Sequence, residues 1–129
     1  MSDRVTADPL NRKVLIVEDD PAIGHMLKTL LSVEGYQPVL VTDGQDGLDA
    51  ARIVRPALMT LDLSLPTLDG TQVLELLDEQ TDVRIPVIIV SAYTDQLTAA
   101  HRARVSAILT KPFEIDTLLS CISTVLGQT

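Results

Sequence analysis

The sequence of 129 residues is poor in aromatic side chains, cysteine and basic groups. Only 2 % of its residues are aromatic, and tryptophan is absent. The single cysteine, Cys121, excludes an internal disulfide framework and suits a reducing compartment. Lysine and arginine total 10 against 18 acidic residues, so the formal net charge is -8. This balance argues against binding to nucleic acid or to an anionic membrane, because phosphate-rich partners require a basic face.

The sequence also lacks any apolar run long enough to cross a bilayer, since stretches such as Val87–Val90 are far too short. Residues 1–12 mix charged and polar side chains without the apolar segment of a signal peptide. The length fits one domain, which we expect to cover residues 12–129, with residues 1–11 as a loose N-terminal extension. We therefore expect a small, acidic, cytoplasmic domain.

What the chain does contain is a series of short apolar runs rich in valine, isoleucine and leucine. Four runs and a shorter fifth are Val14–Val17, Ala57–Leu61, Val87–Val90, Ala107–Thr110 and Val39–Val41. Continuous runs of this length are typical of strands that are buried on both faces.

Segments with helical spacing separate these runs. The first has apolar residues at i, i+3, i+4, i+7 and i+8, namely Ile23, Met26, Leu27, Leu30 and Leu31. The same pattern returns over 115–126 and over 69–79, and weaker alanine-rich patterns cover 44–55 and 95–104. Asp20, Asp43 and Asp69 are expected to be helix N-caps. Five strands alternating with five helices predict an α/β fold with a doubly wound parallel sheet and right-handed crossovers.

Chemically active side chains follow the apolar runs, at the point where each strand should end. Glu18, Asp19 and Asp20 follow the first run, and single residues follow three of the others, namely Asp62, Ser91 and Lys111. In an open α/β sheet ligands bind beyond the carboxyl ends of the strands, so these side chains should converge on one edge.

Such a set of oxygen ligands suits a hard divalent cation, Mg²⁺ or alternatively Mn²⁺. A lysine and a hydroxyl beside the acids are suited to phosphoryl oxygens. An aspartate held next to the metal can itself attack phosphorus and form an aspartyl phosphate. The pattern therefore indicates phosphoryl transfer, which depends mainly on positioning and charge neutralisation.

Four segments resemble the receiver domains of two-component response regulators. They are Val14–Asp20, Leu61–Gly70, Val90–Ala92 and Lys111–Phe113, in family order and at family-like spacing. The resemblance runs from about Lys13 to Leu126. It implies a receiver domain over residues 12–129 with a flavodoxin-like fold, in which five helices surround a five-stranded parallel sheet of order 2-1-3-4-5.

The resemblance also implies how a phosphoryl group would be held. Asp62 would be the phosphoacceptor, with Lys111 pairing with one phosphoryl oxygen. The Ser91 hydroxyl, after a small shift, and the Ala92 backbone N–H would contact the others. Pro112 would follow a cis peptide bond, which is tolerated almost only before proline.

By the same resemblance, Mg²⁺ would be held by Asp19, by Asp62 and by the backbone carbonyl of Ser64. Glu18 would act on the metal through water. Ser64 and Tyr93 occupy two variable positions that, in similar domains, tune how fast the phosphate is lost.

The chain departs from the family at two positions on the face where receivers usually meet their partners. Ile108 stands three residues before the lysine, where the family usually has tyrosine or phenylalanine. Isoleucine is stiff at χ1 and has no hydroxyl, so the inward ring movement of the family is not expected. Arg104 stands where similar domains mostly have glycine. Arg102 and Arg104 are interpreted as a solvated pair, with a partner-binding patch as the alternative. His101 is interpreted as a solvated histidine that has no partner with which to form a metal site.

The resulting hypothesis is a switch rather than an enzyme, whose only reactions are its own phosphorylation and autodephosphorylation. The expected partners are a histidine kinase or phosphotransfer protein and a downstream protein or output domain, and a homodimer is also compatible with the sequence. An alternative is an interaction module of the same fold that acts without phosphorylation. A phosphatase or nucleotide-using enzyme is disfavoured, because no aspartate stands two residues after Asp62 and no glycine-rich phosphate loop follows a strand.

Overall fold

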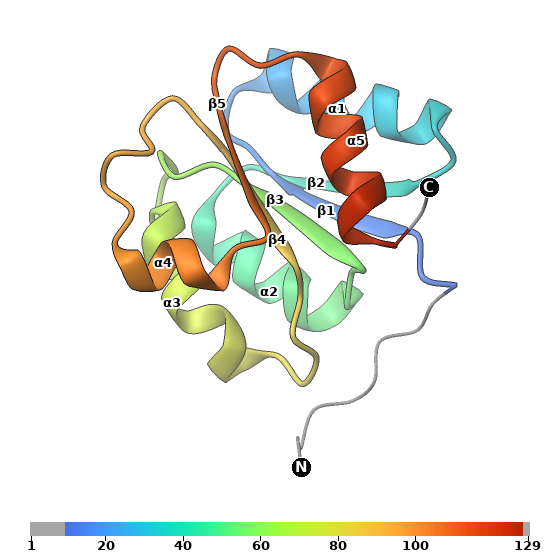
Figure 1. Cartoon of the computed structure of the whole chain (residues 1–129). Coiled ribbons are helices and arrows are strands. Elements are labelled where there is room, and N and C mark those ends of the chain that lie inside the picture. The colour runs from blue at the N-terminus through green and yellow to red at the C-terminus, as the bar shows by residue number, and fades with distance from the viewer. Residues whose placement is uncertain (1–9, 128–129) are drawn as a thin grey trace.

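The computed structural model describes residues 10–127, in which a parallel sheet lies between two layers of helices (Figure 1). The strands are β1 (Lys13–Val17), β2 (Gln37–Val41), β3 (Leu58–Leu61), β4 (Val87–Ser91) and β5 (Ala107–Thr110). The helices are α1 (Pro21–Val33), α2 (Gly44–Val54), α3 (Gly70–Gln80), α4 (Ala99–Arg104) and α5 (Ile115–Val125). The strand order is β2-β1-β3-β4-β5, and every pairing is parallel. The predicted doubly wound, flavodoxin-like fold is confirmed.

The position of each strand in the sheet, inner or edge, explains how continuous its apolar run is. Every residue of the inner strands β3 and β4 is buried, as are the four apolar residues of β1, because helices cover both faces of the sheet. Residues of α1 and α5 pack on one face, and residues of α2 and α3 pack on the other. The edge strands β2 and β5 are only partly buried, which accounts for the weaker apolar signal of β2.

The predicted caps set where three helices begin. The carboxylates of Asp20, Asp43 and Asp69 each accept a backbone N–H from the first turn of α1, α2 and α3. Because a cap satisfies N–H groups that have no partner inside the helix, it fixes the helix start next to the preceding loop. These loops carry the polar residues at the carboxyl edge of the sheet.

Helix α4 is shorter than the predicted segment 95–104. It begins at Ala99, because Thr98 and not a residue near 95 makes the capping hydrogen bond. Of the predicted N-terminal extension, residues 1–9 lie outside the described residues. Asn11 donates from its side-chain amide to the Arg55 carbonyl at 2.8 Å, so this end of the predicted extension is bound to the domain. No helix within residues 10–127 is long and apolar enough to cross a membrane.

Candidate phosphoryl-transfer and metal site

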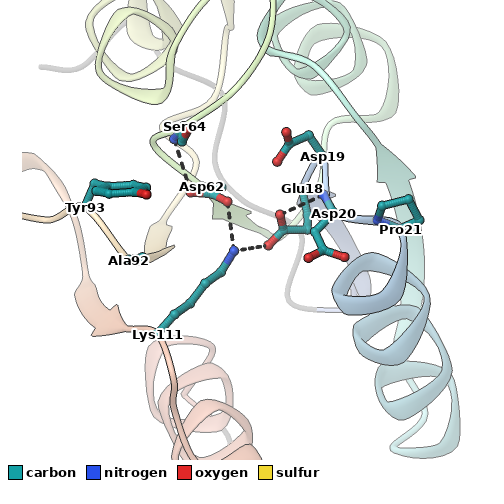
Figure 2. Close-up of a pocket in the computed structure, with 9 residues that line it drawn as sticks. All are labelled: Glu18, Asp19, Asp20, Pro21, Asp62, Ser64, Ala92, Tyr93 and Lys111. Atoms are coloured by element: carbon teal, nitrogen blue, oxygen red, sulfur yellow. Dashed lines mark hydrogen bonds and ion pairs between the residues drawn. The ribbon is translucent and has the colours of Figure 1, made fainter.

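The predicted convergence of side chains at one edge of the sheet is confirmed for the residues that follow β1, β3 and β5. Glu18 follows β1, Asp62 follows β3 and Lys111 follows β5, and the three side chains point toward one another (Figure 2). Glu18 and Asp62 are only 3 % and 5 % exposed. Two carboxylates with so little access to water require a cation between or beside them.

Lys111 supplies that positive charge. Its ammonium nitrogen lies 2.7 Å from Oε1 of Glu18 and 2.9 Å from Oδ2 of Asp62. The other Asp62 oxygen, Oδ1, accepts the backbone N–H of Ser64 at 3.2 Å. Both oxygens of Asp62 are therefore oriented, one by the Lys111 side chain directly after β5 and one by its own loop.

Glu18 and Asp62 are both buried next to Lys111, but their pKa values shift in opposite directions. Burial raises the pKa of Glu18, and its hydrogen bond with Lys111 offsets this only in part. Burial alone would also raise the pKa of Asp62, but hydrogen bonds from Lys111, Ser91 and Ser64 outweigh it and lower the pKa. Burial would lower the pKa of Lys111, yet its two carboxylate partners raise it. Asp62 is thus held ionised beside a charged lysine, as a nucleophile must be.

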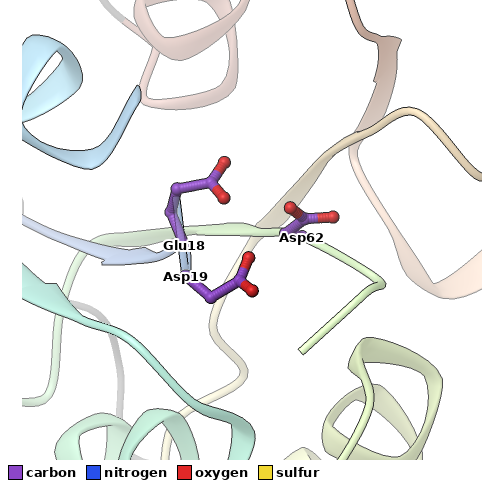
Figure 3. A group of neighbouring side chains, drawn as sticks. All are labelled: Glu18, Asp19 and Asp62. Atoms are coloured by element: carbon purple, nitrogen blue, oxygen red, sulfur yellow. The ribbon is translucent and has the colours of Figure 1, made fainter. Parts of the chain in front are cut away.

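Asp19 completes a group of carboxylates that could hold a metal ion. Carboxylate oxygens of Glu18, Asp19 and Asp62 lie within 4.8 Å of one another (Figure 3). Asp19 is exposed, so this side of the cluster opens to solvent. The donors are all hard oxygens, and an open side leaves room for the waters that Mg²⁺ keeps. The chemistry of this donor set therefore fits Mg²⁺.

These residues line a cavity of about 430 Å³, together with the loops that follow β1 and β4. Asp20, which was expected both at this edge and as a helix cap, is in its wall together with Pro21, the first residue of α1. Pro21 was not predicted to line the site, and its place directly after the three acids was the available signal. Ala92 and Tyr93 are exposed at the opposite wall, as Figure 2 shows. Ser91 is fully buried, and its hydroxyl accepts the Tyr93 N–H at 3.2 Å.

Gly70 allows the loop after Asp62 to close tightly on the strand end. A Cβ atom at this position would lie 2.3 Å from the Asp62 carbonyl oxygen and 2.6 Å from Cα of Leu63. The Gly70 N–H instead donates to the Leu63 carbonyl at 2.8 Å. Any larger residue would push helix α3 away from the backbone of Asp62, so the sequence Asp69-Gly70 both caps the helix and makes room for the site.

The two departures from the family, Ile108 and Arg104, lie on β5 and at the end of α4. Ile108 is half-buried and packs against the apolar cluster between the sheet and helices α2 and α3. The Lys111–Pro112 peptide bond is cis, as the resemblance predicted.

The interpretation of His101 and Arg104 as solvated side chains is wrong. Arg104 binds Asp78 of α3, and His101 binds Glu75 of the same helix, with each side chain only 11 % exposed. The spacing of residues along α4 shows which side chains share a face, but it does not show which face packs against α3. The interpretation was wrong because it considered α4 without its neighbouring helix. The one available signal was that both pairs are three residues apart, at 75 and 78 and at 101 and 104.

Comparisons with known proteins agree with the geometry. A family model described as response regulator receiver domain matches residues 14–123. The DNA-binding response regulator MtrA of Mycolicibacterium smegmatis is 36 % identical over 88 residues, covering 68 % of this chain and 38 % of MtrA. The matched part of this chain therefore spans less than half the length of MtrA.

Two further relatives match over most of both chains. Sporulation initiation phosphotransferase F of Bacillus subtilis is 32 % identical over 115 residues, covering 88 % of this chain and 92 % of that protein. The receiver domain of the sensor histidine kinase PA1611 of Pseudomonas aeruginosa has a TM-score of 0.81 at 26 % identity, covering 92 % of this chain and 99 % of that one. That structure has a magnesium ion coordinated in its active-site cleft.

Proposed function

Because this chain belongs to the family of response regulator receiver domains, we propose that it accepts a phosphoryl group on Asp62 from a histidine kinase or a phosphotransfer protein. The observation that carries the proposal is the position of Lys111, whose ammonium group contacts both Glu18 and Asp62 at the mouth of an open cavity. An ionised aspartate beside a fixed cation can attack an electrophile that arrives with negative charge.

In the proposed reaction, a carboxylate oxygen of Asp62 forms a bond to phosphorus. The bond between phosphorus and the donor's imidazole nitrogen breaks, and its electron pair stays on that nitrogen. Lys111 then pairs with a phosphoryl oxygen, while the Ser91 hydroxyl and the Ala92 N–H donate to the others. Because the Ser91 hydroxyl now accepts the Tyr93 N–H at 3.2 Å, Ser91 has to shift slightly to take part.

The metal-binding residues would be Asp19, Asp62 and the backbone carbonyl of Ser64, with Glu18 acting through a water molecule. The close approach of three carboxylates supports this assignment. Mg²⁺, or Mn²⁺ in its place, would neutralise charge on the phosphoryl oxygens and on the acidic cluster. Asp19 is the residue best placed to admit the metal, because its side chain is exposed to solvent.

The proposed output is a change in a surface that a downstream protein or output domain binds, in a domain that covers residues 12–129. We expect a cytoplasmic protein whose only reactions are its own phosphorylation and dephosphorylation, and which can form a homodimer. Tyr93 and Ser64, at the cavity, would tune the lifetime of the phosphate. Ile108 has no aromatic ring that could rotate inward on phosphorylation, as the ring at this position does in the family. The response of this face would therefore depend on how the Ile108 side chain packs.

The test is the intact mass of the protein after incubation with a small acyl phosphate and Mg²⁺. We expect the wild type to gain one phosphoryl mass, and this gain to disappear in Asp62→Asn and in the presence of a chelator. Asp43→Asn is the matched control, because Asp43 is a partly exposed N-cap outside the lining of the cavity, and asparagine caps equally well. Tryptophan fluorescence is not an option, because the chain has no tryptophan.

An unmodified wild-type protein that binds Mg²⁺ and is folded by circular dichroism would contradict the proposal. It would favour an interaction module that acts without phosphorylation. A phosphoryl gain that persists in Asp62→Asn would move the acceptor to another residue.

A further inference from the structure

Helix α4 begins with a capping box in which a histidine takes the place of the usual glutamate or glutamine. The Thr98 hydroxyl accepts the His101 N–H at 3.1 Å, and Nδ1 of His101 accepts the Thr98 N–H at 3.0 Å. A capping box satisfies two backbone N–H groups that the helix itself cannot. In α4, one of them depends on an imidazole nitrogen.

The contacts of His101 define its protonation state. Nδ1 faces an N–H group, so it must be the bare acceptor nitrogen of the ring. Nε2 lies 3.0 Å from Oε1 of Glu75 on α3, so it must carry the hydrogen and donate it. This is the neutral Nε2–H tautomer, with both ring nitrogens engaged and the side chain only 11 % exposed.

Helix α3 provides an internal comparison, because it begins with the same motif. There Gln72 occupies the equivalent position, and its amide oxygen accepts the Asp69 N–H at 3.0 Å. An amide oxygen stays an acceptor at every pH of interest, whereas histidine changes charge near neutral pH. Besides their N-cap side chains, Asp69 and Thr98, the two caps therefore differ in how the acceptor of the N-cap N–H responds to protons.

The other end of α4 is held by a contact that does not titrate near neutral pH. The Arg104 guanidinium binds the Asp78 carboxylate through two hydrogen bonds and the Ile85 carbonyl through a third. Arginine keeps its charge throughout the range in which histidine titrates. The last turn of α4 thus remains attached to α3 whatever the state of His101.

The charges around His101 act in both directions. On α3, the acidic Glu75 contacts the ring, and Asp69 lies within electrostatic reach of it. The same helix as His101 carries the basic residues Arg102 and Arg104, and its first turn holds the positive end of the helix dipole. If the acids hold the protonated ring in place, Nδ1–H meets the Thr98 N–H; if the ring leaves, Thr98 loses its acceptor. Either outcome opens the cap.

We propose that α4 carries a pH-sensitive N-terminal cap, in which protonation of His101 at Nδ1 releases the Thr98 N–H and loosens the first turn of the helix. The Arg104 contact keeps the last turn on α3, so the helix opens from one end. Arg102 of the same helix donates to the Thr94 carbonyl at 3.1 Å. Loosening is therefore expected to reach the loop that carries Ala92 and Tyr93 at the cavity, independently of any phosphoryl group on Asp62.

The test is nuclear magnetic resonance of the full chain over about pH 5 to 8, the range in which histidines titrate. At the upper end we expect the His101 ring to be the Nε2–H tautomer. On acidification, the amide protection factor of Thr98, corrected for the intrinsic exchange rate at each pH, should fall about fivefold, the ratio that loss of a typical N-cap produces. The Asp69 amide should keep its protection throughout.

Two glutamine variants make the test specific. His101→Gln restores the usual capping residue, so the Thr98 amide should stay protected at all pH values. His25→Gln is the matched control, because His25 is exposed on α1 and is the only other histidine in the sequence. This variant should behave as the wild type does. A Thr98 amide whose protection stays constant while the His101 ring titrates would overturn the proposal, and so would a step that persists in His101→Gln.

Discussion

Arg104 and Asp78 form a bidentate ion pair that joins helix α4 to helix α3. Nε and Nη2 of the guanidinium each lie 2.9 Å from a different oxygen of the carboxylate. Nη2 also donates to the Ile85 carbonyl at 2.8 Å, just before β4 begins. One side chain thus connects three segments, and the geometry uses the planar fork that distinguishes arginine from lysine.

Truncation of this arginine should destabilise the domain. We expect Arg104→Ala to lower the free energy of unfolding by about 2 kcal/mol, because it removes two charged hydrogen bonds to the Asp78 carboxylate and one to the Ile85 carbonyl, while Asp78 keeps its longer contact with Arg84 at 3.5 Å. Arg104→Lys should recover only part of the loss, since an ammonium group cannot make the paired contact. Urea unfolding followed by circular dichroism measures both changes.

Arg52→Ala is the matched control, because Arg52 makes a 3.7 Å ion pair with Asp49 on the surface of α2. An exposed pair of this kind contributes about 0.5 kcal/mol or less. Equal stability of the Arg104→Ala and Arg52→Ala variants would show that the ion pair between Arg104 and Asp78 does not stabilise the fold.

Replacement of Lys111 should lower the free energy of unfolding more at neutral pH than at acidic pH. In the wild type the pKa of Asp62 is lowered, so its ionised form stabilises the fold above the pKa of the unfolded chain. That contribution disappears as the pH falls through the folded-state pKa. In Lys111→Met the ionised Glu18 and Asp62 would face each other without a cation, at a cost of about 3 kcal/mol at neutral pH.

The difference between wild type and Lys111→Met should shrink as the pH approaches about 4, where carboxylates become protonated. Urea unfolding of both proteins at several pH values, without divalent cations, measures it. Lys28→Met, at an exposed position on α1, should show no such pH dependence. A constant difference over the whole range would mean that Lys111 acts through packing rather than through charge.

Magnesium should stabilise the folded protein through Asp19. A ligand that binds only the folded state raises its stability in proportion to the logarithm of ligand concentration over Kd, once the ligand is in excess. We expect the melting temperature of the wild type to rise with Mg²⁺ concentration, and Asp19→Asn to shift this rise to at least tenfold higher concentration, about 1.4 kcal/mol of binding free energy.

Asp20→Asn separates metal binding from a general effect of negative charge. Asp20 lines the same cavity but caps α1 through its side chain, a role that asparagine fills as well. This variant should keep most of the response to Mg²⁺. The assignment of Asp19 would be wrong if Asp20→Asn lost as much of the response as Asp19→Asn.

Thr67 combines backbone strain with two useful hydrogen bonds. Its φ is 65°, a region that β-branched residues rarely occupy. Its hydroxyl donates to Oδ1 of Asp43 at 3.2 Å and accepts the Gln45 N–H at 3.0 Å, at the start of α2. Thr67→Ala and Thr67→Gly both lose these bonds, but only glycine removes the strain.

We therefore expect Thr67→Gly to be more stable than Thr67→Ala by about 1 kcal/mol, although glycine gains more freedom in the unfolded chain. Thermal and urea unfolding of the two variants provide the comparison. A more stable alanine variant would indicate that the loop relaxes to a negative φ when the hydroxyl is absent.

The sequence alone determined the fold and the composition of the site. A strand that is covered by helices on both faces needs apolar side chains on both faces, whichever helices cover it. It is therefore recognisable in the sequence as a continuous run rich in valine and isoleucine. The residue that follows such a run lies at the carboxyl edge of a parallel sheet, so Glu18, Asp62 and Lys111 could be expected to meet. Aspartate caps were predictable for the same local reason.

Only the tertiary structure decided how these residues interact and what α4 does. That Lys111 contacts Glu18 as well as Asp62 depends on side-chain geometry across three strands. The partners of His101 and Arg104 lie on another helix, 26 residues away in sequence. Helical periodicity identifies which residues share a face, but the packing of two helices determines which faces meet. The sequence therefore predicted where the chemistry is, and the structure decided how α4 is held beside it.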